Sequence, residues 1–436
     1  MKQLTELATP FASVADSTPL IGQQLPWLQS LRQQASEQFK TNGLPSKKQE
    51  DWKYTSLWEL SQQAFTHTAN PVTLTTQHCD QLALLQDAYR VVIVDGSFSA
   101  ELSTIDNLQT GVIIAPLSAS LEQLEHQLGQ QVDIDKAGLT ALNTMLMNEG
   151  VVITVADDVK VQKPIELLVI HSGSTDNLST HLRNSVSLST NSQATFIEHY
   201  VSLNDASSFT NVVTEVALAE QAELDHYKLQ QESVNAFHIA TLAATQAESS
   251  QWRTNNISLG AKLARNDVHT RLLGEQAHTV MDGLYLVNGD QHVDNHTRID
   301  HLVPNTTSEE MYKGVLDDNS HAVFNGKVVV HKDAQKTDAN QSNRNLLISR
   351  GCEIDTKPEM EIYADDVKCG HGSTVGQLDE DQLFFLRARG LDAVSARSLL
   401  TYAFAVEVLE RIPSEIIRQA FSVVIEQRLP RPSVAA

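Results

Sequence analysis

The alternation of hydrophobic and polar residues changes character twice along the chain. Apolar residues recur at helical spacing over residues 25–39, and Asn42-Gly43 ends this predicted helix. A second helix is predicted over residues 138–148, and the apolar run at 90–95 predicts a short buried strand between the two. We therefore expect residues 1–150 to form a mainly helical N-terminal domain.

Residues 151–375 follow a different pattern, in which short β-type runs are separated by small polar breaks. These breaks recur roughly every 25 to 30 residues, a period typical of repeat architectures. They are Asn191-Ser-Gln-Ala194, Glu220-Gln-Ala222, Gln246-Ala247 and Glu275-Gln-Ala277. Short strands of this kind are stable only when each covers its neighbour. An antiparallel sandwich also contains many short strands, so the pattern by itself leaves a sandwich and a β-helix open.

The pattern returns to helix in residues 376–436. Asp392 is a predicted N-cap for one helix, and Pro413-Ser414 begins a second one. Both helices carry an apolar stripe, which includes Phe404 and Phe421. Such a hairpin either caps the β-region or presents a docking surface to another chain, and the pattern is compatible with both.

Composition and charge argue against nucleic-acid binding, membrane insertion and a disulfide-bonded fold. The 436 residues carry a formal net charge of −22, which repels a nucleic-acid backbone. The first 20 residues lack the pattern of a secretory leader, and no apolar run reaches the ~20 residues that cross a bilayer. We therefore expect a cytoplasmic protein that binds neither nucleic acid nor membrane. The three cysteines are odd in number and widely spaced, which disfavours a disulfide framework.

The sharpest candidate for chemistry is Cys369-Gly-His371. In an extended segment, residues two apart point to the same face, so this thiol and imidazole can approach one soft metal ion or cluster. A single Cys-x-His pair does not complete a tetrahedral site, so the remaining ligands must come from elsewhere or from another chain. The alternative interpretation is a small buried thiol beside a hydrogen-bonded histidine.

Other candidates are weaker. Cys79 and Cys352 lie outside any Cys-x-x-Cys pair, and Cys352 is interpreted as a buried filler. In a strand, His292 and His296 share one face while His301 takes the other. The charged residues between these histidines favour a polar, hydrogen-bonded surface over a metal site.

Enzymatic motifs are also missing. Gly326-Lys327 lacks the other positions of a phosphate-binding loop, and no Gly-x-Ser-x-Gly motif occurs. A carbohydrate-active β-helix would use converging carboxylates. The pairs Asp317-Asp318 and Asp365-Asp366 are adjacent in sequence, so in a strand their side chains would diverge.

Several longer motifs resemble the SufB/SufD family of iron–sulfur cluster assembly scaffolds. They are Glu50-Asp-Trp-Lys-Tyr54, Asn191-Ser-Gln-Ala-Thr195, His296-Thr-Arg-Ile-Asp-His-Leu-Val-Pro304, Val323-Phe-Asn-Gly-Lys327, Gln341-Ser-Asn-Arg-Asn-Leu346 and Ala364-Asp-Asp-Val-Lys-Cys369. The resemblance covers nearly the whole chain and is greater to the SufD branch than to the SufB branch. Gly370 departs from the pattern, where Ser is more usual.

The resemblance implies a right-handed parallel β-helix over 151–375, flanked by helical N-terminal and C-terminal domains. It implies a non-catalytic scaffold that pairs with SufB through β-helix edges, and it leaves a homodimer open as an alternative for the isolated chain. His371 and Cys369 would contribute to a transient iron–sulfur cluster shared with SufB. The SufC ATPase would dock on the C-terminal helices around Phe404 and Phe421, so this chain needs no ATP site, and a flavin would belong to the whole complex.

Two alternatives to this scaffold function remain open at this point. The first is a β-helix enzyme that acts on carbohydrate. The second is a purely structural partner, in which Cys369 and His371 only contribute to the core.

Overall fold

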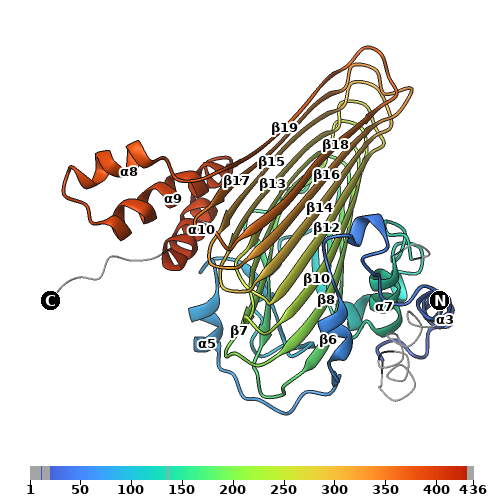
Figure 1. Cartoon of the computed structure of the whole chain (residues 1–436). Helices are drawn as coiled ribbons and strands as arrows, with labels where there is room; N and C mark the ends of the chain where they lie inside the picture. The colour runs from blue at the N-terminus through green and yellow to red at the C-terminus, as the bar shows by residue number, and fades with distance from the viewer. Residues whose placement is uncertain (1–10, 12–19, 135–136, 430–436) are drawn as a thin grey trace.

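The computed structural model describes residue 11, residues 20–134 and residues 137–429. Its main body is a parallel β-helix built from two facing sheets, with helices near both ends of the chain (Figure 1). From β4 onward, consecutive strands alternate between the sheets, and each strand from β6 to β17 pairs in parallel with the strand two elements earlier and the strand two elements later. Only the first strands differ among the described residues, since β1 pairs with β2 and β3 pairs with β4 in antiparallel fashion. The parallel pairing confirms the β-helix and excludes the antiparallel sandwich.

The two sheets are named here by their last strands. The β19 sheet contains, in spatial order, β2 (Ser97–Phe98), β1 (Tyr89–Val94), β5 (Ile165–His171), β7 (Gln193–Ser202), β9 (Glu223–Gln231), β11 (Gln251–Ser258), β13 (His278–Val287), β15 (Thr307–Leu316), β17 (Asp338–Leu347) and β19 (Lys368–Gly376). The β18 sheet contains β3 (Val112–Pro116), β4 (Val151–Val155), β6 (Leu178–Leu188), β8 (Ser208–Leu218), β10 (Phe237–Gln246), β12 (Leu263–Leu272), β14 (His292–His301), β16 (His321–Val330) and β18 (Glu353–Ile362).

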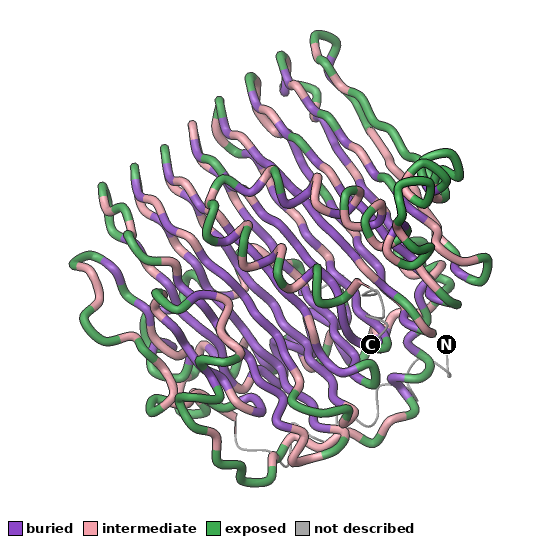
Figure 2. Tube along the Cα trace, turned by 90° about the vertical axis from the view of Figure 1, so that its left-hand side faces the viewer, coloured by how far each residue is buried: buried purple, intermediate pink, exposed green. Residues whose placement is uncertain are grey.

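The polar breaks of the sequence are the tight turns between the sheets. Asn191, Gln221 and Ser249 adopt left-handed backbone conformations, with φ of 54°, 58° and 56°. The backbone N–H of each donates to a carbonyl of the next turn at 2.9 Å. Stacked turns therefore continue the hydrogen bonding of the strands, which explains why the breaks recur at a nearly constant interval. Figure 2 shows the result, with buried strands between exposed turns.

Helices from the N-terminal part cover the outer face of the β18 sheet. They include α3 (Pro26–Asn42) and α7 (Gly138–Leu146), which confirm two predicted helices. Both pack against apolar side chains of β8, β10 and β12. The shorter elements are η1 (Glu50–Trp52), α4 (Trp58–Gln62), α5 (Thr76–Leu82), α6 (Leu117–Ser120) and η2 (Leu121–Gln123). The strand predicted at 90–95 is β1, which pairs with β5 and so lengthens the β19 sheet.

Three C-terminal helices follow β19, namely α8 (Glu380–Arg387), α9 (Ala393–Leu409) and α10 (Glu415–Arg428). The Asp392 side chain caps α9 and the Ser414 side chain caps α10, as the sequence predicts. Helices α9 and α10 lie against the outer face of the β19 sheet, where their apolar residues join those of β9, β11 and β13. Helix α8 extends away from the β-helix (Figure 1).

Two glycines make room for tyrosine rings inside the β-helix. Gly283 lies opposite Tyr312, and Tyr285 lies opposite Gly314. A Cβ atom on Gly314 would lie 2.1 Å from Tyr285 Cε2, and one on Gly283 would lie 2.1 Å from Tyr312 Cε1. Each ring therefore occupies the space that the facing residue leaves empty.

We expect Gly314→Ala to lower the free energy of unfolding by about 1–3 kcal/mol, because overpacking of a filled interior forces side chains from their preferred rotamers. Gly376→Ala is the matched control, because no heavy atom lies within 4 Å of a Cβ at that position. Urea denaturation of both variants checks this, and equal midpoints would contradict it.

Candidate functional site

The β-helix ends at two free strand edges. Strand β19 pairs only with β17 and strand β18 only with β16, so each has one edge with no partner strand among the described residues. Both strands are far more exposed than the strands before them. Unpaired N–H and C=O groups in such an edge are a template for another strand.

Cys369 and His371 lie on β19 and share one face of it. Cys369 lies opposite Ala339 of β17, and His371 lies opposite Gln341. Cys369 is half-buried against the apolar interior, whereas His371 is exposed. The sequence prediction that this thiol and imidazole share a face is confirmed, since both follow the inward-facing positions of the stack.

The residue beneath His371 offers an unused hydrogen-bond acceptor. The Gln341 side chain is only 3% exposed, and its Nε2 donates to Glu310 Oε2 at 2.7 Å. Thr297 donates to the other oxygen of Glu310 at 2.5 Å. Within the described ranges, Gln341 Oε1 has no hydrogen-bond partner. A column of polar groups thus leads from a buried carboxyl to the exposed imidazole.

A second polar column reaches the open end beside the first one. Tyr285 donates to Asn345 at 2.5 Å, and Asn345 donates to Asn343 at 2.6 Å. Thr356 of β18 donates to Asn343 at 2.8 Å and lies 2.9 Å from the Ser373 hydroxyl of β19. The open end is therefore lined by hydrogen-bonding groups from both sheets.

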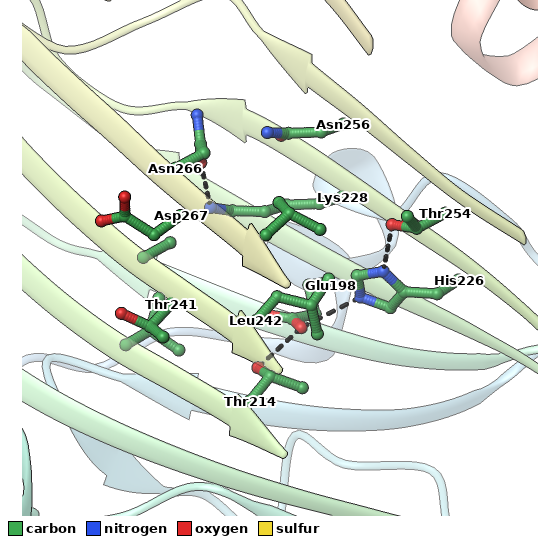
Figure 3. A pocket seen from close by; sticks show the side chains of 13 residues that line it. Glu198, Thr214, His226, Lys228, Thr241, Leu242, Thr254, Asn256, Asn266 and Asp267 are labelled. Atoms are coloured by element: carbon green, nitrogen blue, oxygen red, sulfur yellow. Dashed lines mark hydrogen bonds and ion pairs between the residues drawn. The ribbon is translucent and has the colours of Figure 1, made fainter. Parts of the chain in front are cut away.

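Deeper in the β-helix, a buried ionic cluster fills the interior (Figure 3). His226 Nε2 lies 3.0 Å from Glu198 Oε1, and Thr214 donates to the same oxygen at 2.8 Å. Burial raises the pKa of Glu198, but hydrogen bonding and charge from His226 outweigh this effect and bring the pKa to about 2. Burial also lowers the pKa of Lys228, which donates to Asn266, to about 8. The charged groups of this cluster have buried partners, which avoids the cost of an unpaired buried charge.

Comparison with known proteins identifies the family. The family model for the SufBD core domain, described as SUF system FeS cluster assembly, matches residues 170–404, and the model for the SufBD protein N-terminal region matches residues 13–167. The chain belongs to the SufBD family. Membership gives it a role in iron–sulfur cluster assembly, and the resemblance inferred from the sequence is confirmed.

Relatives of similar length match nearly end to end. The iron–sulfur cluster assembly SufBD family protein slr0076 of Synechocystis is 34% identical, over 94% of this chain and 93% of its own length. The SufD protein of Escherichia coli is 34% identical, over 91% of this chain and 92% of its own. The SufD protein of Bacillus subtilis is 27% identical, over 93% and 95%. Among the described residues, no helix of this SufBD chain is long and apolar enough to cross a membrane.

The remaining cysteine and histidine candidates of this SufBD chain are not grouped with Cys369 and His371. Cys79 and Cys352 are buried, and Cys352 Sγ lies 3.0 Å from the Ser349 carbonyl oxygen, consistent with its interpretation as a filler. His301 is held inside by Thr306 and Ser308, whereas His296 Nε2 pairs with Asp294 Oδ1 at 3.0 Å. The predicted division of these histidines between the two faces is confirmed.

The two phenylalanines proposed for partner binding differ in exposure. Phe421 is 1% exposed and packs edge-on against Tyr227, with ring centroids 5.9 Å apart. Phe404 is half-buried, with Lys313 Nζ lying 4.3 Å from its ring centre. Phe421 therefore holds the hairpin to the sheet. The exposed apolar side chains of the C-terminal helices are Phe384, Phe385, Val394, Leu399, Ile416 and Val423.

The buried carboxyl of Glu310, which lies beneath Gln341 and His371, makes the stability of the fold depend on pH. Burial raises the pKa of Glu310 to about 7, although hydrogen bonds from Gln341 and Thr297 act in the opposite direction. The folded protein therefore retains a proton that the unfolded chain loses near its ordinary value of 4.5. It follows that the contribution of Glu310 to the free energy of unfolding falls as pH rises from about 4.5 to about 7.

We expect Glu310→Gln to be more stable relative to wild type at pH 8 than at pH 5, by on the order of 1–3 kcal/mol. Urea unfolding at both pH values measures the difference. Glu309→Gln, which removes the adjacent carboxylate on the outer face, is the control. An equal trend in this control would assign the effect to overall charge and not to the buried carboxyl.

Proposed function

We propose that this SufBD-family chain is a non-catalytic scaffold for iron–sulfur cluster assembly. It pairs with a SufB subunit through the free edges of β18 and β19, presents His371 to a nascent cluster at that seam, and docks the SufC ATPase on its C-terminal helices. The observation that carries the proposal is that an incomplete ligand set and two unpaired edges occur together at one end of the β-helix.

The free edges favour a partner other than a second copy. The outer face of β18 presents Glu353, Asp355, Glu359 and Glu361. Two copies of β18 side by side would bring these acidic rows close together, and like charges across a strand pair are destabilising. A different subunit with a complementary edge avoids this cost. The same argument disfavours a stable homodimer through β18.

The chemistry at the open end favours His371 over Cys369. Imidazole is a suitable ligand for iron, and His371 is exposed at the end of the stack. Burial raises the pKa of Cys369, so the thiol keeps its proton more readily than a free cysteine does. Because these side chains fill only part of a coordination sphere, a cluster bound here needs ligands from the partner. A cluster that is held by few ligands is also released more readily to an acceptor protein.

The C-terminal helices have two different faces. One face carries Phe421 and Ile425 into the contact with the β19 sheet. The other leaves Ile416 69% exposed and Val423 53% exposed on α10. Exposed apolar side chains on a rigidly attached hairpin suit a protein contact. We assign this outer face to the ATPase, which would supply the nucleotide-driven rearrangement of the complex.

His371→Ala should strongly reduce iron and acid-labile sulfide on the co-purified complex and leave its subunit composition unchanged, because it removes a ligand from a shared site. His331→Ala, which changes a partly exposed histidine directly after β16, is the control. Unchanged cluster content in His371→Ala would favour the purely structural partner, in which the Cys369 and His371 side chains have no ligand.

Ile416→Glu should reduce the amount of ATPase that co-purifies, because it places a charge in the proposed apolar contact. The same substitution at Ile113, which is 52% exposed on β3, controls for surface charge. Pull-down stoichiometry measures the effect, and full ATPase retention by Ile416→Glu would exclude this face as the docking surface.

A further inference from the structure

A second group of possible metal ligands lies on the outer face of the β18 sheet. His321 is the first residue of β16, Glu353 is the first residue of β18, and these two residues are register partners. Asp355 lies two positions after Glu353, so its side chain points to the same face. The ligand atoms of the three side chains all lie within 4.8 Å of one another, and His321 Nε2 lies 2.8 Å from Asp355 Oδ2.

The donor set suits a divalent transition metal. One imidazole and two carboxylates are the ligand types that bind zinc and ferrous iron in open sites with three protein ligands. Ligands around such an ion lie roughly 3–3.5 Å apart, as its bond lengths of about 2.0–2.2 Å require. Glu353 is exposed and can rotate, so the three donors can converge without movement of the backbone.

The carboxylates have no fixed positive charge to neutralise them. The next outward-facing residue of β18 is Lys357, whose Nζ contacts Glu50 at 3.0 Å and Glu359 at 2.7 Å. Within the described ranges, no lysine or arginine forms an ion pair with Glu353 or Asp355. A bound cation would supply the missing charge.

A different cluster, near the opposite ends of the strands of the same sheet, shows what charge compensation looks like. His269 and His331 both contact Asp300, at 2.7 Å and 3.2 Å. Arg298 also binds both oxygens of Asp300, at 2.7 Å and 2.9 Å. The guanidinium supplies a fixed positive charge to this carboxylate. The group at β18 has similar ligands but lacks this arginine.

A second histidine packs against His321. His292 lies opposite His321 on β14, and the two rings meet edge to face with centroids 4.7 Å apart. Thr55 donates its one hydroxyl proton to Asp294 at 2.5 Å, so its oxygen accepts from His292 Nε2 at 2.8 Å. This chain of hydrogen bonds fixes the His292 ring, which packs against the His321 ring.

We propose that His321, Glu353 and Asp355 bind one divalent transition-metal ion of the zinc or ferrous type at the free edge of β18. Its remaining coordination positions face outward, toward solvent or a neighbouring strand. This site is separate from the proposed cluster site, and its existence does not depend on that function.

The test is a Co²⁺ titration of the full-length, chelator-treated protein, followed by visible absorption and repeated with Zn²⁺ by calorimetry. Wild type should bind one ion at this site. His321→Gln and Asp355→Asn should each weaken binding at least about tenfold. Glu353→Gln, an exposed change at a strand edge, should also weaken binding and tests the site without disturbing the fold.

Two matched variants locate the binding. His331→Gln changes the arginine-compensated cluster and should bind as wild type does. His371→Gln changes the proposed cluster site and should keep the one ion held by His321, Glu353 and Asp355. Absence of binding by wild type, or unchanged affinity in the His321, Asp355 and Glu353 variants, would overturn the proposal. Loss of metal binding in His371→Gln alone would also overturn the proposal, because that result would assign the ion to the open end of the β-helix.

Discussion

The fold depends on hydrogen bonding between successive turns of the chain. Each strand satisfies its backbone groups through the turn before it and the turn after it, and even the tight turns continue this ladder. Such a stack has no intrinsic end, so its last turn must leave N–H and C=O groups without partners. In this protein that turn also carries His371. The candidate ligand therefore lies in the turn whose backbone groups have no partner strand among the described residues.

The interior combines two kinds of packing. Apolar side chains fill part of it, whereas a deep cluster around Glu198 and the columns near the open end are polar and hydrogen-bonded. A buried polar group is costly unless it has a partner. Most of these groups are paired within the stack, and Gln341 Oε1, directly beneath His371, is one that is not. The unpartnered oxygen of Gln341 matters because it lies next to the last turn of the stack.

Local features of the fold could be predicted from the sequence. The helix at Pro26–Asn42 and the caps Asp392 and Ser414 depend on residues close together in the chain, and all were predicted. The sandwich and the β-helix could not be distinguished by periodicity, because their strands have the same alternation. Pairing between turns joins residues about 30 positions apart, and this information decides the architecture.

The same limit applies to the site. Cys369 and His371 could be selected because they are neighbours in sequence, whereas the Glu310–Gln341–His371 column required the register of three strands. The burial of Phe421 was also beyond a single-sequence pattern, because an apolar stripe does not reveal what covers it. Assignment of His371 to a shared cluster remains a prediction.

The reciprocal Gly–Tyr pairs of β13 and β15 specify the register between these two strands. A slip of two residues would keep the inward and outward faces correct but would destroy the match between each ring and its facing glycine. Apolar contacts alone would tolerate such a slip much better. Strand β17 pairs with β15, and β19 pairs with β17. The alignment of β13 and β15 therefore also determines the position of the His371 imidazole along the free edge of β19. The two Gly–Tyr pairs thus set the alignment of a site with which they have no contact.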